Sequence, residues 1–426
     1  MNEFAETWEA ELRRFLEELL RFDTTSGAEA EAQNWMRERF ESFGFETYEW
    51  EADPEELAGH PSFPDDPAVI ETADRPSVAG VVEVGDADAG PTLVLNGHVD
   101  VVPVTEGAWD SDPFEPVWDG SQVTARGAAD MKSGLAACVF AARHVAELAA
   151  EGELAFDGRI VVESVAGEEE GGIGAAAAAL SNPYPFDRDA AIIAEPTELE
   201  VVTAVEGSVM KELRIEGRSA HAATRWRGES VLPHFEAIRH AFEELEAERE
   251  ERVTHPLYEQ FPVKWPVCFG TVRAGNWASA VPDELVAQVR IGVAPGETVA
   301  DVEAEFEERL ASVVEERDWL REHPPTFERF SIQFEAAEVD LETPVVTAMQ
   351  AAASANGFDP EPRGATYGAD SRHYEAAGIP TVLFGPGSIE QAHFPNETID
   401  FEEVVAAAGV IADAAARFCR GGRGAE

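Results

Sequence analysis

The sequence predicts an α/β fold with a mainly parallel sheet, interrupted by a second domain of α+β type. Over residues 78–195, apolar strand-like runs alternate with helical runs, as they do where crossover helices join parallel strands. From Gly207 the order becomes strand, helix, two strands, helix and strand, which is a complete βαββαβ unit. After about Val339 the alternation of helical and strand-like runs resumes. A small domain is therefore expected to be inserted into a larger one.

The chain length agrees with this division, because 426 residues are too many for one ordinary hydrophobic core and suit two domains. We expect residues 1–206 and 335–426 to form a discontinuous large domain. Residues 207–334 are expected to form the insert, with the ferredoxin-like βαββαβ order.

The large domain is expected to begin with an amphipathic helix, in which apolar residues recur from Phe4 to Leu19. Residues 51–77, rich in proline and acids, are expected to form a surface loop without a chemical role. The further elements are, in order, the strands VAGVVEVG and TLVLNG, the helix MKSGLAACVFAARHVAELAA, the strand RIVVESVA, an alanine-rich helix, the strand AAIIAE, the helix TPVVTAMQAAASANG, the strand TVLFG and a helix from Phe401 to Phe418.

The insert is expected to contain four strands and two helices. Thr298, followed three residues later by Asp301, is an N-cap signature that marks the start of the second helix. The other elements are the strand SVMKELRIEG, the helix ESVLPHFEAIRHAFEELEAE, the strands CFGTVRAG and LVAQVRIGV, and a last strand RFSIQFEAA.

The charge balance is extreme, with 84 Asp+Glu against 31 Lys+Arg and a formal net charge of -53. An apolar content of 44% and the periodic segments nevertheless favour a folded chain with an acidic surface over disorder. Such a surface makes nucleic acid and anionic membranes poor partners. Lysine is nearly absent, which is typical of cytoplasmic proteins of salt-loving organisms. Molar salt would screen the repulsion, since the Debye length falls to about 3 Å at 1 M.

Cysteine usage and the N-terminal segment indicate a cytoplasmic protein. Cys138, Cys268 and Cys419 are too scattered for a disulfide framework or a metal-site spacing. The N-terminal segment lacks the pattern of a signal peptide, and the sequence has no uninterrupted apolar run long enough to span a membrane.

Histidine is scarce in this acid-rich chain and is therefore informative. His98 and Asp100 fall at the end of the buried strand TLVLNG, two residues apart and so on one side. Ligands of open α/β sheets bind at this end of the strands. His98 is a candidate metal ligand whose other ring nitrogen Asp100 would hold. A hydrogen-bonded buried pair without a metal is the competing interpretation.

Further carboxylates follow other strands of the same sheet. Glu168–Glu170 come after RIVVESVA, Glu195 follows AAIIA, and His393 comes shortly after TVLFG. Asp130 stands at the mouth of a helix, where it could also serve as a cap. Three adjacent carboxylates directed into one cleft repel one another unless a cation or a proton intervenes.

A glycine pattern in the same region suggests a different function. Gly172, Gly174 and Ala177 form G-x-G-x-x-A between a strand and a helix, and Glu195 follows about twenty residues later, as in a dinucleotide site. Glu168–Glu170 would stand where the pyrophosphate must bind, and like charges there oppose binding. A nicotinamide-dependent oxidoreductase thus remains only an alternative.

A two-metal site accounts for these residues together. Two divalent ions about 3.5–4 Å apart require imidazoles, carboxylates and one bridging carboxylate. The residues that supply this set are His98, Asp130, Glu169, Glu195 and His393. Zinc is the expected metal, with cobalt or manganese as alternatives.

The ordered motifs H-x-D, G-x-x-D-M-K-x-G, E-E-x-G-G, A-E-P-T and A-H-x-x-N-E resemble those of the M20 family of metallopeptidases and deacylases. The resemblance spans nearly the whole chain and implies a zinc-peptidase-like catalytic domain with an inserted lid or dimerisation domain. It implies that Asp130 bridges the metals and is followed by a cis peptide. The implied ligands of one ion are His98 and Glu195, and those of the other are Glu169 and His393.

The resemblance also implies catalytic roles for residues outside the ligand set. Glu168 would be the general base, Asp100 is counted with the catalytic residues as the partner of His98, and His221 in GRSAHAA would polarise the scissile carbonyl. Two departures concern Gly167, where the family usually has aspartate, and Glu170, which makes the register of the glutamates ambiguous by one residue. We align on the following glycine pair, which leaves Glu170 as a solvated acid.

Three residues are candidates for binding the substrate. Ser279 stands where many members have asparagine, a variant that resembles the acetylornithine deacetylase-like branch. Arg290 and Arg372 could hold a substrate carboxylate with the guanidinium fork, although ion pairs with the many acids would explain them equally well.

These observations predict a metal-dependent hydrolase, acting as a homodimer on the amide bond of a small N-acyl amino acid, as acetylornithine deacetylase and succinyl-diaminopimelate desuccinylase do. A dipeptidase or carboxypeptidase with the same site is the nearest alternative. A two-domain amino-acid-binding protein without catalysis is an alternative of another class.

Overall fold

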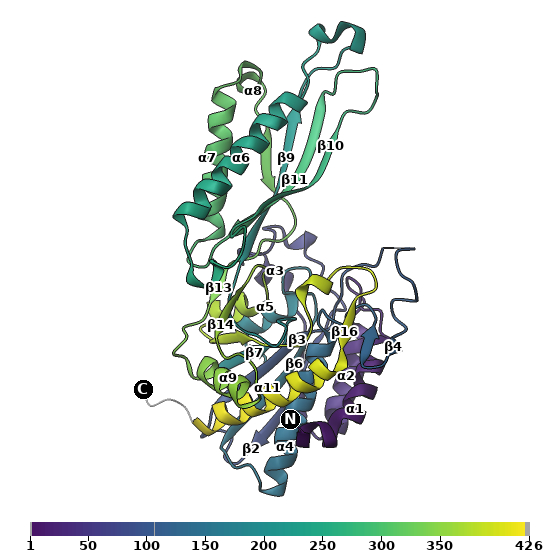
Figure 1. The fold of residues 1–426 in the computed structure, drawn as a ribbon, viewed down its shortest axis with the longest axis vertical. Helices are drawn as coiled ribbons and strands as arrows, with labels where there is room; N and C mark the ends of the chain where they lie inside the picture. The colour runs from purple at the N-terminus through teal and green to yellow at the C-terminus, as the bar shows by residue number, and fades with distance from the viewer. Residues whose placement is uncertain (1, 106, 422–426) are drawn as a thin grey trace. The chain divides into compact units, whose positions relative to one another are not determined.

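The protein is described by a computed structural model covering residues 2–105 and 107–421. The chain divides into two compact units (Figure 1). The large unit comprises Met1–Ala204, Glu338–Gly364 and Ala369–Glu426, and the small unit comprises Val205–Ala337 and Ala365–Gly368. The insert predicted over residues 207–334 starts two residues later and ends three residues earlier than the main segment of the small unit, and the short second segment of that unit was not predicted.

The large unit is built on a sheet that has nine strands within the described residues, in the order β1-β2-β6-β3-β7-β15-β8-β13 with β14 beside β8. Its centre is parallel, because β3 runs parallel to β6 and β7, and β15 runs parallel to β7. The expected α/β class is thus confirmed. The strands are β1 (Glu46–Trp50), β2 (Ser77–Val84), β3 (Thr92–His98), β6 (Gly158–Val165), β7 (Ala190–Ile193), β8 (Val201–Val205), β13 (Ala337–Glu338), β14 (Pro362–Ala365) and β15 (Thr381–Leu383).

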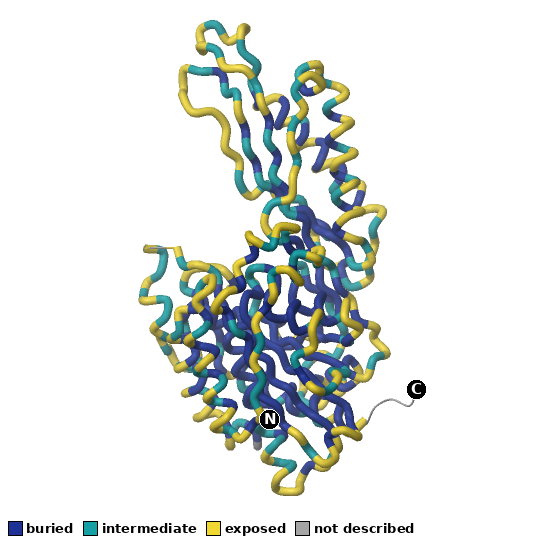
Figure 2. The backbone as a smooth tube through the Cα atoms, turned by 180° about the vertical axis from the view of Figure 1, so that it is seen from behind, coloured by how far each residue is buried: buried dark blue, intermediate teal, exposed yellow. Residues whose placement is uncertain are grey.

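The central strands β3, β6 and β7 are buried along their whole length, as Figure 2 shows for the core of the large unit. Burial on both faces explains why their sequences are mostly apolar and do not alternate between apolar and polar residues. One of the covering helices, α4, packs on β3 and β6 and contacts α1 and α11. The helices of this unit are α1 (Asn2–Leu20), α2 (Ala30–Ser42), α3 (Pro54–Leu57), α4 (Lys132–Glu151), α5 (Ile173–Leu180), α9 (Pro344–Ala355), α10 (Ser371–Ala376) and α11 (Phe401–Gly421).

A second, three-stranded sheet in the large unit was not anticipated. It consists of β4 (Val117–Asp119), β5 (Gln122–Thr124) and β16 (Thr398–Asp400), in the order β16-β5-β4. The pairing of β16 with β5 brings the segment that carries His393 beside the segment that leads to Asp130.

The small unit contains an antiparallel sheet in the order β10-β11-β9-β12. This order is that of a ferredoxin-like βαββαβ unit. The core of the unit lies between the sheet and helices α6 and α7, where Phe242 and Phe306 meet edge to face. The elements are β9 (Gly207–Glu216), α6 (Leu232–Arg252), β10 (Val267–Ala274), β11 (Glu284–Val293), α7 (Val299–Glu315), α8 (Asp318–Glu322) and β12 (Thr326–Arg329).

The last strand of the insert was misplaced by the sequence analysis. RFSIQFEAA alternates like a strand, but β12 ends at Arg329, where that segment begins. Ser331 has a φ of 57°, which turns the backbone out of the extended conformation. The amide oxygen of Gln333 then accepts the hydrogen bond of the Met210 N–H at 2.8 Å, so that a side chain takes the place of a ladder partner.

Candidate metal centre

His98 is the last residue of β3 and is 1% exposed. Its Nδ1 lies 2.9 Å from the carbonyl oxygen of Asp100, which can only accept, so Nδ1 carries the hydrogen. Nε2 then faces Asp130 Oδ1 at 3.1 Å. The expectation that the Asp100 carboxylate holds the ring is corrected, because that carboxylate lies 3.7 Å away and the main chain makes the hydrogen bond.

The Asp100 carboxylate instead holds the turn after β6. It accepts hydrogen bonds from the backbone N–H groups of Gly167, Glu168 and Glu169 at 2.8, 3.2 and 3.1 Å. Gly167 has a φ of 75°, and a Cβ there would lie 2.9 Å from Ile173, so this turn requires glycine where the family usually has aspartate. Asp100 therefore positions the glutamates.

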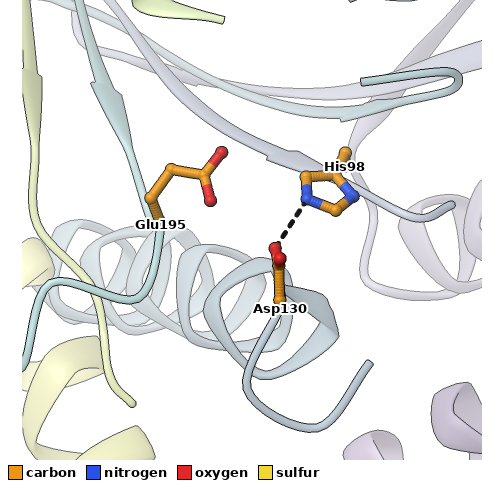
Figure 3. Close-up of side chains that lie close together, drawn as sticks. All are labelled: His98, Asp130 and Glu195. Carbon is orange, nitrogen blue, oxygen red and sulfur yellow. Dashed lines mark hydrogen bonds and ion pairs between the residues drawn. The ribbon is translucent and has the colours of Figure 1, made fainter. Parts of the chain in front are cut away.

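A first triad consists of His98, Asp130 and Glu195 (Figure 3). One ligand atom from each of the three residues lies within 4.8 Å of the others, and all three residues are buried. Gly134 in the first turns of α4 makes this approach possible, because a Cβ there would lie 1.9 Å from the carbonyl oxygen of Ala194. The helix that follows Asp130 can therefore press against the chain that carries Glu195.

A second triad consists of Asp130, Glu169 and His393. His393 Nε2 lies 3.1 Å from Glu169 Oε2 and 3.4 Å from Asp130 Oδ2. Asp130 thus directs Oδ1 to the first triad and Oδ2 to the second, which is the arrangement of a carboxylate that bridges two cations. The peptide bond from Asp130 to Met131 is cis.

The charges at the two triads are unbalanced unless positive charge is added. Burial, followed by the repulsion of neighbouring carboxylates, raises the pKa of Glu195 well above its ordinary value, and the same two causes raise the pKa of Glu169. The hydrogen bonds to Asp130 and Glu169 raise the pKa of His393 to about 10. The raised pKa values show that the site favours added positive charge. A divalent cation would supply that charge, and imidazole and carboxylate groups are donors that zinc accepts, so the residues fit such an ion.

Glu168 belongs to neither triad, although it adjoins Glu169. It is 7% exposed, and burial raises its pKa well above the ordinary value, with the charges of Asp370 and Glu195 adding to the effect. A buried carboxylate with a raised pKa, next in sequence to a member of a triad, has the properties of a candidate general base.

Glu170 keeps 39% of its side chain exposed, as expected of a solvated acid, but it also has a buried partner. It forms an ion pair with Arg75, whose side chain is 2% exposed and also binds the buried Glu29 at 3.2 Å. Arg75 belongs to the proline-rich segment 51–77, which was expected to be a surface loop without a role. That segment therefore contributes a buried cation that braces the glutamate turn.

Sequence analysis missed Asp370, which precedes α10. Its side chain is 1% exposed, and within the described residues neither carboxylate oxygen has a hydrogen-bond partner. Burial raises its pKa to about 6, and its charge acts on Glu168. The segment YGADSRHY was noted only for its arginine, because one more acid gives no signal in a chain with 84 of them.

The expected substrate-binding residues fall in both units. In the large unit, Arg372 is buried on α10 and donates to the carbonyl of Ala369 at 2.9 Å. In the small unit, Arg290 donates to Glu206 at 3.1 Å and to the carbonyl of Thr366 at 3.3 Å, so its guanidinium is engaged in an ion pair with a buried acid.

His221 and Ser279 lie on neighbouring exposed segments of the small unit. The carbonyl oxygen of Ser279 accepts from the N–H of Ala222 at 2.9 Å. Nδ1 of His221 accepts from the N–H of Ala223 at 3.1 Å, which leaves the hydrogen on Nε2.

The α/β fold and the paired triads define a metal-dependent hydrolase with a candidate dinuclear centre. Its sequence matches peptidase family M20/M25/M40 over residues 94–417. The chain belongs to this family, which confirms the resemblance found in its motifs and favours hydrolysis over the oxidoreductase and binding-protein alternatives.

Proteins with similar sequences or folds match most of the chain. An N-formyl-4-amino-5-aminomethyl-2-methylpyrimidine deformylase of Halalkalibacterium halodurans is 27% identical over 397 residues, 88% of this chain and 86% of the relative. An acetylornithine deacetylase of Erwinia tasmaniensis is 28% identical, over 77% of this chain and 80% of the relative. The fold matches an M20 family metallo-carboxypeptidase from Sulfolobus solfataricus with a TM-score of 0.72 at 17% identity, covering 96% of this chain and 99% of that one.

Within the part of the chain that the structure describes, none of the helices combines the length and the apolar character needed to cross a bilayer.

Proposed function

We propose that the protein is a two-metal deacylase that removes a small acyl group, formyl or acetyl, from a primary amine. The observation that carries the proposal is the orientation of Asp130, because one of its carboxylate oxygens faces the first triad and the other faces the second. The buried Glu168 stands next in sequence to Glu169, a member of the second triad. A structural ion would need one closed set of ligands, whereas two adjoining sets that share a carboxylate, with a buried carboxylate next in sequence to one of the ligands, suit hydrolysis.

The residues that would hold the ions are His98 and Glu195 on one side, Glu169 and His393 on the other, and Asp130 between them. When bound, two zinc ions supply Lewis acidity and lower the pKa of water to near neutrality. The ligand atoms lie at the carboxyl ends of the strands, where open α/β sheets bind their substrates.

Glu168 performs the proton transfers in this proposal. Its carboxylate takes a proton from the attacking water and delivers it to the nitrogen of the leaving amine, so that water and an amide give a carboxylic acid and an amine. The raised pKa of Glu168 favours both transfers, because a stronger base accepts the first proton more readily and still releases it to an amine.

His221 is suited to donate a hydrogen bond to the carbonyl oxygen of the substrate. The contact at Nδ1 leaves Nε2 with its hydrogen on an exposed ring. Such a donor would stabilise the negative charge that develops on the oxygen in the transition state. We propose, as the family resemblance implies, that this histidine serves the centre of a second subunit in a homodimer.

The choice of an N-acyl amine over a peptide is supported by the relatives. Those with 27% and 28% identity over most of both chains are a deformylase and a deacetylase. A probable carboxypeptidase of Aspergillus flavus is 29% identical but covers less, 74% of this chain and 70% of the relative. An N-acetyl diamino acid lies within the proposed class, and an N-succinyl diamino acid and a dipeptide are the further candidates.

The proposal is tested by metal analysis and a substrate panel in high salt. The purified chain should contain two divalent ions, and kcat/KM should be higher for N-formyl and N-acetyl amines than for N-succinyl amino acids and dipeptides. Hydrolysis of dipeptides alone would reassign the substrate class. A metal-free protein that hydrolyses none of the panel after zinc is added would overturn the proposal.

A further inference from the structure

Glu397 is a fully buried carboxylate that is held by four N–H donors. Oε1 accepts from the backbone of Ala129 at 2.6 Å and of Asp130 at 2.9 Å. Oε2 accepts from the backbone of Gly127 at 3.0 Å and from Nη1 of Arg126 at 2.8 Å. Its side chain is 0% exposed. One carboxylate therefore accepts hydrogen bonds from four residues of the segment 126–130, which ends in Asp130.

The sequence builds this contact from two distant segments. Glu397 directly precedes β16, and β16 pairs with β5 so that Ile399 lies opposite Val123. The chain from β5 to Asp130 then curls around the glutamate, with Gly127 at a φ of 81°. Successive backbone N–H groups that converge in this way form a nest for an anion, and here the anion is a side chain of the same protein.

The turn that carries Glu169 is held in the same manner. Asp100 accepts from three backbone N–H groups of that turn. Asp100 follows the candidate ligand His98 by two residues, and Glu397 follows the candidate ligand His393 by four. Each histidine segment therefore also supplies a buried carboxylate that fixes the turn of a carboxylate ligand.

We propose that Glu397 is a positioning residue for Asp130, and that it sets the orientation in which the two carboxylate oxygens of Asp130 face separate metal ions. The inference rests on the proposed two-metal function. It assigns to Glu397 an effect on both ions at once, although Glu397 itself is a member of neither triad.

Substituting glutamine keeps the size of the side chain but replaces one oxygen by an NH₂ group. That group cannot accept, so it would face either the N–H groups of Ala129 and Asp130 or the Gly127 N–H together with the Arg126 guanidinium, and the turn would have to open. Outer partners of metal ligands typically contribute about 10–100-fold to metal affinity. Since Asp130 is shared, we expect a loss of this size for both ions.

A matched control is Glu375, a half-buried glutamate in the same unit. Its Oε1 accepts from the backbone N–H of Thr381 at 2.6 Å, and it belongs to neither triad. Glu375→Gln therefore perturbs a hydrogen bond between a side chain and the backbone at the amino end of β15, the opposite end from the carboxyl ends of the parallel strands, where His98 and Glu195 lie.

The experiment measures zinc binding to the metal-free full-length chain by competition with a chromogenic chelator in high salt, together with thermal unfolding of the metal-free forms. The unsubstituted chain should bind two ions. Glu397→Gln should bind both about 10–100-fold more weakly, whereas Glu375→Gln should bind like the unsubstituted chain even if it unfolds at a lower temperature. If Glu397→Gln does not fold, Glu397→Asp, which keeps the charge but is shorter, is measured in its place and should show the same direction of change.

Unchanged affinity in the Glu397 variant would overturn the inference, as would an equal loss in Glu375→Gln, which would indicate general destabilisation. Failure of the unsubstituted chain to bind metal would instead refute the proposed function. The two failures are therefore distinguishable.

Discussion

Replacing Glu168 by glutamine removes the proposed base without changing the size of the side chain. Glu168 lies outside both triads, so both metal ions should stay bound in the variant. General-base catalysis contributes about 10²–10⁴-fold, which corresponds to about 3–5 kcal/mol of barrier, and kcat should fall by that factor with KM nearly unchanged.

The two glutamates that follow should respond differently to the same substitution. Glu169 faces His393 at 3.1 Å in the second triad, so Glu169→Gln should weaken or remove one ion, and excess zinc should restore part of the activity. Glu170→Gln removes one partner of Arg75, which still keeps the buried Glu29. Activity should therefore change little, and the free energy of unfolding should fall by about 1 kcal/mol.

The assay is bound zinc and steady-state kinetics for the three variants, with urea unfolding for Glu170→Gln. The outcome that would refute the reasoning is loss of metal in Glu168→Gln with retention in Glu169→Gln, because the register of the glutamates would then be wrong by one residue. A loss of more than about 3 kcal/mol in Glu170→Gln would show that Arg75 depends on Glu170 instead of Glu29.

Three further predictions concern salt, pH and assembly. The net charge of -53 predicts loss of structure and activity at physiological ionic strength. An unchanged circular dichroism spectrum and full activity after dialysis into dilute buffer would contradict this prediction. Burial raises the pKa of Glu206 from 4.5 to about 7, so the folded chain keeps a proton that the unfolded chain releases. The contribution of this proton to the free energy of unfolding is fully present below pH 4.5. It falls by about 3 kcal/mol as the pH rises to about 7. Urea unfolding of Glu206→Gln should lack this part of the pH dependence, and an identical decline in the variant would refute the assignment. Mixing inactive His221→Ala with inactive Glu168→Ala subunits should restore part of the activity if His221 serves the partner's centre, whereas mixed dimers without recovery would count against it.

The fold was predictable because its central strands are buried on both faces. Runs such as TLVLNG in β3 and RIVVESVA in β6 are mostly apolar without alternation and are buried at every position, and parallel strands covered by helices commonly have that pattern. The end of the insert was not predictable in this way. In RFSIQFEAA, polar and apolar residues alternate as they do in a strand. No local feature of the sequence shows that Ser331 adopts a positive φ or that the Gln333 side chain takes the place of a strand partner.

The site was predictable where residue types were rare and unpredictable where they were common. His98 and His393 are two of only ten histidines; His98 ends an apolar strand and His393 follows another, β15. Asp370 and Glu397 are two of 84 acids, and their importance depends on burial and on contacts with residues far away in the sequence. The position of Asp100 was noted correctly, but whether its carboxylate or its main chain would reach His98 depends on backbone geometry that spacing does not encode.

The division of the chain has a consequence for the order in which the protein folds during synthesis. The sheet and helices of the small unit lie between β9 and β12, so this unit can form most of its core once residue 329 has left the ribosome. The large unit must wait for β15, and its second triad for His393, which is synthesised after β15 and well after the insert. We therefore expect metal capture to be a late event in biogenesis, and nascent chains that stop before residue 393 to carry a folded insert beside a large unit that has yet to complete its centre.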